Sequence, residues 1–307
     1  MSGDLTLARE ILWEACGERA RQGFPMASLT TFRIGGRAAL FLEPEDEGDL
    51  TAAGDAIVRA GIPFVVLGKG SNVLVADDGF PGLVLRLGRG FRWAARDGDV
   101  VRAGGAMPLP ALAGIALQHG LAGLAFAVAI PASLGGAVRM NAGAHGGQMS
   151  DIVEEVEVFY LRGGGVQDLA AGAVGFDYRQ TELPSDAVVT GARLRLQPGD
   201  LVAIRAAMDD ARRWRRETQP IAEPNCGSVF TNPPGVHAAA LIDAAGLKGE
   251  RIGGASVSRK HANFIVTGPG ATAADVEALI DLIRQRVEAS AGIHLTPEVR
   301  VIGGERD

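Results

Sequence analysis

Two segments that contain glycines, residues 66–75 and 130–143, limit the folds and functions open to this chain more than any other feature of its sequence. In the first, an apolar run enters a turn that contains two glycines and Lys69, and a second apolar run follows. Glycine tolerates positive φ and close approach, so successive N–H groups in such a turn can converge on an anion. The second segment repeats this chemistry with Ser133, Gly135 and Gly136. Together the segments predict a backbone cradle for a phosphate-bearing cofactor.

Composition favours a globular protein. The chain has 307 residues, of which 47% are apolar, which is enough for two domains. A net charge of −6 and one short basic run at 212–216 argue against a nucleic-acid partner. Cys16 and Cys226 are too few for a disulfide framework, and the first residues resemble no signal peptide, so we expect a cytoplasmic protein.

Residues 120–138 contain no charged side chain and are long enough to cross a bilayer. The stretch is nevertheless rich in glycine, includes Pro131 and lacks dense Leu, Ile and Val. We therefore expect a buried loop system around a ligand, without membrane insertion.

The pattern of apolar residues predicts an α+β fold. A strand at 39–42, a helix at 45–60 and a strand at 63–67 form a β-α-β unit that leads into the first glycine turn. A charged amphipathic helix at 201–216 marks a change of pattern after residues 197–200. We expect a cofactor domain at 1–198, with subdomains of about 1–88 and 89–198, and a smaller α+β domain at 199–307. Further helices are expected at 5–20, 109–119, 236–245 and 272–291, and strands at 83–87, 100–103, 152–160, 228–230, 263–266 and 298–302.

The motifs exclude several chemistries. The turn at 68–72 lacks the spacing of a Walker P-loop and of the three-glycine dinucleotide fingerprint. Cys226 and Ser228 are candidate nucleophiles, yet no nucleophile elbow and no assignable histidine accompany them. Ser228 can instead donate a proton. The five histidines have no metal-ligand spacing, so no catalytic metal is expected.

Seven motifs, in order along the chain, resemble the UDP-N-acetylenolpyruvoylglucosamine reductases, flavoenzymes of peptidoglycan precursor synthesis. The resemblance runs from about residue 30 to 302, and the short spacing between Arg179 and Ser228 is similar to the type II form. The motifs lie at residues 31–36, 68–72, 130–143, 178–179, 227–230, 261–265 and 297–300.

This resemblance implies an FAD-binding domain of the vanillyl-alcohol-oxidase (PCMH) type in two subdomains, followed by a substrate-binding domain. It implies that NADPH reduces FAD, and that hydride then passes from flavin N5 to C3 of UDP-N-acetylglucosamine enolpyruvate. Arg179 and Glu298 are implied to polarise the substrate, with Glu298 carrying or sharing a proton, and Ser228 to protonate C2. Tyr178 and Asn232 match substrate positions. FAD contacts are implied for Gly68, Lys69, Gly70, Ser71, Asn72, Ile130, Ser133, Gly135, Gly136, Asn141, Ala142 and Gly143.

Several positions depart from the family pattern. Asn72 stands where related oxidases often carry the histidine that tethers flavin, so we expect dissociable FAD. Ala129 and Ala132 replace glycines, which raises the question of their backbone conformation. Thr218 stands where many relatives have lysine, so no diphosphate-binding role is transferred to it, and a neighbouring arginine can compensate.

Two other functions fit parts of the sequence. An oxidase acting on a sugar or lactone with O₂ could use the same flavin domain and would not need NADPH. A non-catalytic flavin-binding or nucleotide-binding module would keep the glycine segments but has no reason to keep Arg179, Ser228 and Glu298 in these contexts. We expect a monomeric enzyme.

Overall fold

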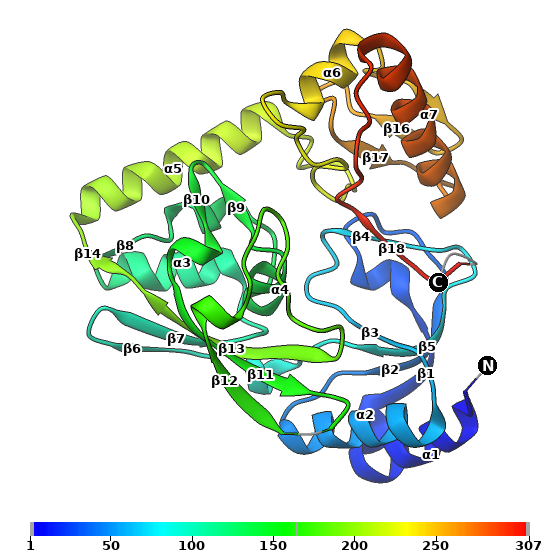
Figure 1. Ribbon diagram of the computed structural model, residues 1–307, viewed down its shortest axis with the longest axis vertical. Helices are drawn as coiled ribbons and strands as arrows, with labels where there is room; N and C mark the ends of the chain where they lie inside the picture. The colour runs from blue at the N-terminus through cyan, green and yellow to red at the C-terminus, as the bar shows by residue number, and fades with distance from the viewer. Residues whose placement is uncertain (1–2, 164, 305–307) are drawn as a thin grey trace. The chain divides into compact units, whose positions relative to one another are not determined.

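The computed structural model describes residues 3–163 and 165–304, and these divide into two compact units. The first unit comprises residues 1–23, 39–69 and 82–213, and the second comprises 24–38, 70–81 and 214–307. Mixed helices and strands confirm the α+β class (Figure 1). The compact units follow a different division from the predicted functional boundary near residue 198, which stays a prediction.

The first unit contains a four-stranded sheet of order β1-β2-β5-β3, in which β1, β2 and β5 each extend past the limits of the unit. Strands β3 and β5 are parallel, with Val66 opposite Leu85. Helices α1 and α2 bury Leu12 and Leu50 against Leu40 and Leu83 of the sheet. The elements are α1 (Leu5–Cys16), β1 (Ala20–Pro25), β2 (Arg37–Leu42), α2 (Glu47–Ala60), β3 (Phe64–Val66) and β5 (Phe80–Leu85).

Local capping explains where these helices end. Asp46 accepts a hydrogen bond from Asp49 N and begins α2, and Gly61 ends it in the left-handed conformation. Helix α1 ends at Cys16, four residues earlier than expected, because Gly17 takes a positive φ of 58°. The expected β-α-β unit is present, although β5 lies between β2 and β3 in the sheet.

A second sheet of the first unit is five-stranded and antiparallel, with the order β12-β11-β13-β7-β6. Leu112 of α3 and Leu134 of α4 belong to the same buried core as Val156 and Leu194 of the sheet. The elements are β6 (Ala94–Asp97), β7 (Val100–Gly104), α3 (Leu109–Gln118), β8 (Leu121–Ala122), α4 (Leu134–Arg139), β9 (Gly143–Ala144), β10 (Gly147–Gln148), β11 (Val153–Tyr160), β12 (Val166–Ala170), β13 (Ala187–Arg195), β14 (Gln197–Pro198) and α5 (Leu201–Thr218).

The second unit has its own core around Phe230, Val276 and Ile283. Strand β18 pairs in parallel with β4, and α7 begins at a capping box formed by Thr272 and Asp275. A strand was expected at 228–230, but the structure has only an isolated bridge between Phe230 and Pro297 there. The elements are β4 (Val73–Val75), α6 (Ala238–Ala244), β15 (Arg251–Ile252), β16 (Ala255–Val257), β17 (Ile265–Thr267), α7 (Ala273–Ala291) and β18 (Arg300–Ile302).

Within the described part of the chain, no helix has the length and apolar character needed to span a bilayer.

Candidate functional site

The two glycine segments meet inside the first unit. A Cβ added to Gly68 would lie 2.6 Å from Ser133 Oγ and 3.6 Å from Gly136 Cα. Ser133 is the N-cap of α4, where its Oγ accepts a hydrogen bond of 3.4 Å from Gly136 N. Gly135 N donates to Gly105 O at 2.9 Å. We call Gly68, Ser133, Gly135 and Gly136 the glycine cradle; because Gly68 has no side chain, Ser133 Oγ can lie directly against the backbone of the first turn.

Lys69 brings positive charge to the edge of this cradle. It follows β3, Arg86 follows β5, and the parallel pairing of these strands puts both residues at the carboxyl edge of the sheet. Burial, and then the positive charges of Arg86 and Arg92, hold the pKa of Lys69 below its usual value. An anion here would relieve the repulsion among the three cations.

The remainder of the first glycine turn belongs to the second unit. Gly70 has a φ of 63°, and a Cβ there would lie 2.0 Å from Leu29 O, so only glycine fits. Asn72 Nδ2 donates to Glu298 O at 3.1 Å, and Arg300 N donates to Asn72 O at 3.1 Å. The turn is therefore tied to the segment that carries Glu298.

Arg179 is fixed against the second glycine segment within the first unit. Its guanidinium donates to Gly143 O at 2.9 Å and to Asn141 O at 3.5 Å, and it lies over the Tyr178 ring at 5.2 Å. Arg179 itself has a φ of 60°, a conformation that is uncommon for a residue with a side chain. The structure thus brings four predicted site residues together: Arg179, Tyr178, Asn141 and Gly143.

The side chain of Asn141 connects the loops around Arg179. Its Nδ2 donates to Asp177 O at 3.0 Å, and its Oδ1 accepts from Ser150 N at 3.0 Å. Asn141 is only 2% exposed. The Asn141 amide therefore holds the Arg179 turn, and the cofactor contact expected for Asn141 stays a prediction.

Ser228 and Glu298 lie on two segments that pair with each other in the second unit. Val229 directly follows Ser228, and Val229 O accepts a hydrogen bond of 2.7 Å from Glu298 N. Val229 and Phe230 are each 1% exposed, so this backbone is enclosed, whereas Ser228 is half-buried. The structure therefore brings the backbones of these two predicted catalytic residues together.

Cys226 is the other candidate nucleophile in this segment. Complete burial, and then the negative charge of Glu298, raise the pKa of the Cys226 thiol. The reactive form of cysteine is the thiolate. Cys226 is therefore an inert, neutral thiol, and Ser228 is the better candidate for chemistry.

Asn225 has a role that the sequence analysis missed. Its Oδ1 accepts from Gly227 N at 2.9 Å, and its Nδ2 donates to Glu223 O at 2.7 Å and to Pro220 O at 3.1 Å. These bonds shape the turn that precedes Ser228. An asparagine two residues before a glycine was the available signal, because such side chains often bond to the backbone two residues on.

Asn232, expected to contact substrate, accepts a hydrogen bond of 3.0 Å at its Oδ1 from Ala238 N at the start of α6.

The two alanines that stand where the family has glycines adopt an ordinary backbone conformation. Among the described non-glycine residues, positive φ occurs only at Arg33, Asn141, His145 and Arg179. Ala129 and Ala132 are therefore unstrained.

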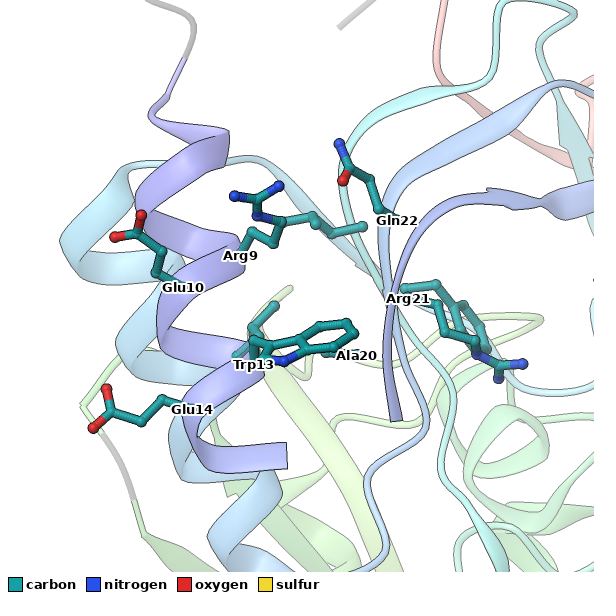
Figure 2. Close-up of a pocket in the computed structure, with 10 residues that line it drawn as sticks. Arg9, Glu10, Trp13, Glu14, Ala20, Arg21 and Gln22 are labelled. Atoms are coloured by element: carbon teal, nitrogen blue, oxygen red, sulfur yellow. The ribbon is translucent and has the colours of Figure 1, made fainter. Parts of the chain in front are cut away.

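A cavity of about 580 Å³ opens between α1, β1 and β2. Figure 2 shows the Trp13 indole directed across it from α1 toward β1. Arg9, Arg21 and Phe41 also line the cavity, and none of the predicted site residues does. We assign it no part in the site.

Comparison with known proteins identifies the family that this chain resembles. A family model described as an FAD binding domain matches residues 38–170, and the model for the UDP-N-acetylenolpyruvoylglucosamine reductase C-terminal domain matches residues 219–302. UDP-N-acetylenolpyruvoylglucosamine reductase from Heliobacterium modesticaldum is 50% identical over 281 residues, covering 91% of this chain and 89% of the relative. The Anaeromyxobacter dehalogenans protein of the same name is 45% identical over 299 residues, covering 97% and 90%.

A crystal structure of UDP-N-acetylenolpyruvylglucosamine reductase (MurB) from Thermus caldophilus is also similar. It is 36% identical, with a TM-score of 0.79, and the match covers 91% of this chain and 97% of that one. The fold and the two matched domains define an FAD-containing oxidoreductase. Identity over nearly the whole length shows more: the chain belongs to the UDP-N-acetylenolpyruvoylglucosamine reductase family.

The residues of the first unit fit FAD. In the glycine cradle, Gly68 and Ser133 lie so close that a side chain at Gly68 would collide with Ser133 Oγ. Lys69, Arg86 and Arg92 would supply positive charge beside the FAD diphosphate. A cluster of cations of this kind favours a bound anion, which fits the diphosphate of FAD.

Proposed function

We propose that this protein reduces UDP-N-acetylglucosamine enolpyruvate to UDP-N-acetylmuramate, with NADPH as reductant, in peptidoglycan precursor synthesis. The observation that carries the proposal is family identity over nearly the whole chain, including both the FAD binding domain and the reductase C-terminal domain. FAD held by the first unit would supply the redox chemistry, which is hydride transfer from NADPH to C3 of the enolpyruvyl group.

The glycine cradle and Lys69 would hold the FAD diphosphate. Gly135 N and Gly136 N already donate to Gly105 O and Ser133 Oγ, so the N–H donors to the phosphate oxygens would come from the first glycine turn, with Lys69 offsetting the charge. Gly68 leaves room for Ser133 Oγ, so the two glycine segments can lie against each other at this point. Gly70, Ser71 and Asn72 would complete the contacts from the second part of the same turn.

Ser228 would supply the proton. Addition of hydride to C3 leaves an electron pair at C2, and the Ser228 hydroxyl gives its proton to C2 to complete the new C–H bond. The resulting alkoxide recovers a proton from solvent. A serine hydroxyl is a weak acid, so the step requires an enclosed site and a strongly basic carbon. Burial of Val229 and Phe230 next to Ser228 is in keeping with such enclosure.

Arg179 and Glu298 would stabilise the charge that develops on the substrate carboxylate as C2 becomes electron-rich. A guanidinium suits this because it presents several N–H donors in one plane. Its two contacts to main-chain carbonyls, at Asn141 and Gly143, fix its position before substrate binds. Glu298 would take up or share a proton beside the substrate carboxylate and donate a hydrogen bond to it.

The Ser228→Ala variant tests this mechanism in two half-reactions followed anaerobically. Reduction of bound flavin by NADPH should stay within about twofold of wild type, because Ser228 takes no part in it. Reoxidation by the enolpyruvyl substrate should slow by about a hundredfold to ten-thousandfold, the usual contribution of a general acid. Ser290→Ala on α7 is a matched control and should leave both rates unchanged. Equal slowing of both half-reactions by Ser228→Ala would disprove the assigned role.

The sugar or lactone oxidase remains the competing function on this flavin domain. The reductase C-terminal match at residues 219–302 favours the reductase, because an oxidase has no need of that domain. We further propose that the enzyme works in the cytoplasm as a monomer. Gel filtration with light scattering would test the second point, and a dimer mass would contradict it.

A further inference from the structure

We propose that Asn263 is a positioning residue that sets the place of the Ser228 hydroxyl and links it to Glu298. This inference rests on the proposed function, because it concerns the proton donor of that reaction. It depends on a set of hydrogen bonds within the second unit, around residues 229 and 230.

Asn263 binds the backbone after Ser228 at three points. Its Oδ1 accepts from Phe230 N at 2.9 Å, and its Nδ2 donates to Phe230 O at 2.8 Å. Its main-chain carbonyl accepts from Val229 N at 2.9 Å. The amide side chain thus pairs with both main-chain groups of Phe230 as a neighbouring strand would, although Asn263 itself lies in a turn just before β17.

The opposite side of the same segment is paired with the chain around Glu298. Val229 O accepts from Glu298 N at 2.7 Å, and Thr231 N donates to Thr296 O at 3.0 Å. Residues 229–231 therefore lie between Asn263 and the backbone of 296–298. A shift of this segment would move Ser228 directly and would disturb the hydrogen bond that fixes Glu298.

Asn263 is itself held in place. It is 4% exposed, and its N–H donates to His261 Nδ1 at 3.3 Å. Ser258 Oγ accepts from His261 N at 3.4 Å, so the loop before Asn263 is internally bonded. Both Oδ1 and Nδ2 of Asn263 are hydrogen-bonded, and no other side chain of this size presents an amide donor and a carbonyl acceptor together.

A positioning role and a purely structural role of Asn263 have different consequences for the reaction rates. Loss of the Asn263 amide leaves buried main-chain groups unsatisfied, which destabilises the fold. Small displacements of a reacting group, of the order of 1 Å, can in addition slow a reaction by about a hundredfold. A purely structural residue would lower the amount of folded protein without changing the relative rates of the two half-reactions.

The experiment uses Asn263→Asp and Asn263→Ala in the full-length, FAD-loaded protein. Aspartate keeps the shape and the acceptor but cannot donate to Phe230 O when ionised. Thr267→Val is the control, because Thr267 Oγ1 makes a comparable buried bond of 2.7 Å to Phe32 O and Thr267 is 7% exposed. Flavin content, flavin reduction by NADPH, and flavin reoxidation by the enolpyruvyl substrate are measured for each protein.

Both Asn263 variants should keep flavin reduction within about twofold and slow reoxidation by about a hundredfold, with little change in substrate KM. The solvent deuterium isotope effect on reoxidation should increase, because proton transfer from a misplaced Ser228 becomes slower. Thr267→Val should change neither the ratio of the half-reactions nor the isotope effect.

Three outcomes would overturn the inference. The half-reactions could fall together, the Asn263 variants could behave like Thr267→Val, or neither Asn263 variant could be recovered folded with flavin. Each would give Asn263 a structural role only. Absence of reoxidation by the substrate in wild type is a different result, because it would contradict the proposed function itself.

Discussion

The side-chain amide of Asn72 donates a hydrogen bond of 3.1 Å to the main-chain carbonyl of Glu298. Arg300 N returns a bond of 3.1 Å to Asn72 O, where β18 begins its parallel pairing with β4. One paired stretch of backbone therefore holds the end of the predicted diphosphate turn and the predicted catalytic carboxylate. Changes at Asn72 are transmitted to Glu298 through the main chain.

Flavin should be bound non-covalently. An amide side chain is not a nucleophile, and Asn72 is already bonded to Glu298 O, so it offers no covalent attachment. Acid precipitation of the purified protein should release all of the flavin into the supernatant. Flavin absorbance that stays with the denatured chain would contradict this prediction.

The Gly68→Ala variant should bind FAD weakly. The new Cβ would lie 2.6 Å from Ser133 Oγ and would displace the N-cap of α4. The flavin-to-protein ratio after gel filtration should fall well below that of wild type.

Gly114→Ala is the control for this change, since a Cβ at Gly114 in α3 meets no atom within 4 Å. Replacement of this helical glycine should stabilise the protein by up to about 1 kcal/mol and leave flavin content unchanged. Normal flavin content in Gly68→Ala would refute the role of the glycine cradle.

We expect Arg215 to bind the substrate diphosphate in place of the lysine that many relatives have at the position of Thr218. The Arg215 guanidinium is half-buried, and its Nε donates at 3.2 Å to the neutral Gln219 Oε1. Burial lowers the pKa of Arg215, but arginine stays protonated at neutral pH. A partly desolvated cation of this kind can bind a diphosphate strongly.

The Arg215→Ala variant should raise KM for the sugar nucleotide roughly ten- to hundredfold, as expected for loss of a charge-assisted hydrogen bond. Flavin reduction by NADPH should be unchanged. Arg213→Ala is the control, because Arg213 is exposed and paired with Asp210. An unchanged KM in Arg215→Ala would rule out the compensation.

Asp275 should make stability depend on pH. Hydrogen bonds from Gly254 N and Thr272 N, each 3.0 Å, hold the pKa of Asp275 below its usual 3.8. A carboxyl whose folded pKa is depressed stabilises the protein above its unfolded pKa, and this contribution is lost as pH falls through the folded pKa.

The Asp275→Asn variant should therefore have a lower Tm than wild type at pH 7, and the difference should shrink below about pH 4. Glu277→Gln on the same helix is the control and should have no such effect, since the capping box of α7 is formed by Thr272 and Asp275. A Tm difference that is constant with pH would contradict the assignment.

Local signals in the sequence predicted much of the fold. Helix α2 was placed within two residues because an acidic start and Gly61 are strong capping signals. The meeting of the two glycine segments was also predicted, and the contact between Gly68 and Ser133 confirms it. The expected strand at 228–230 was wrong because its pairing comes from the Asn263 side chain and from residues near 297, and neither partner is visible in a local pattern.

Long-range relationships could not be predicted from the sequence. Asn72 and Glu298 are separated by 226 positions, and nothing in either motif indicates that they are bonded. The same holds for Asn141: its glycine-rich surroundings suggested a ligand, and nothing in them indicated that its amide joins Ser150 and Asp177. Residue type indicated polarity at these positions, and only the fold identifies the partner.

The most direct test of the proposed reductase activity is to follow the visible spectrum of the purified protein under anaerobic conditions. One equivalent of NADPH should bleach the flavin band near about 450 nm, and UDP-N-acetylglucosamine enolpyruvate should then restore it, because the flavin both performs and reports the redox chemistry. Bleaching without recovery would show a flavoprotein with a different substrate. A colourless protein that binds no added FAD would contradict both the FAD site and the reductase activity that depends on it.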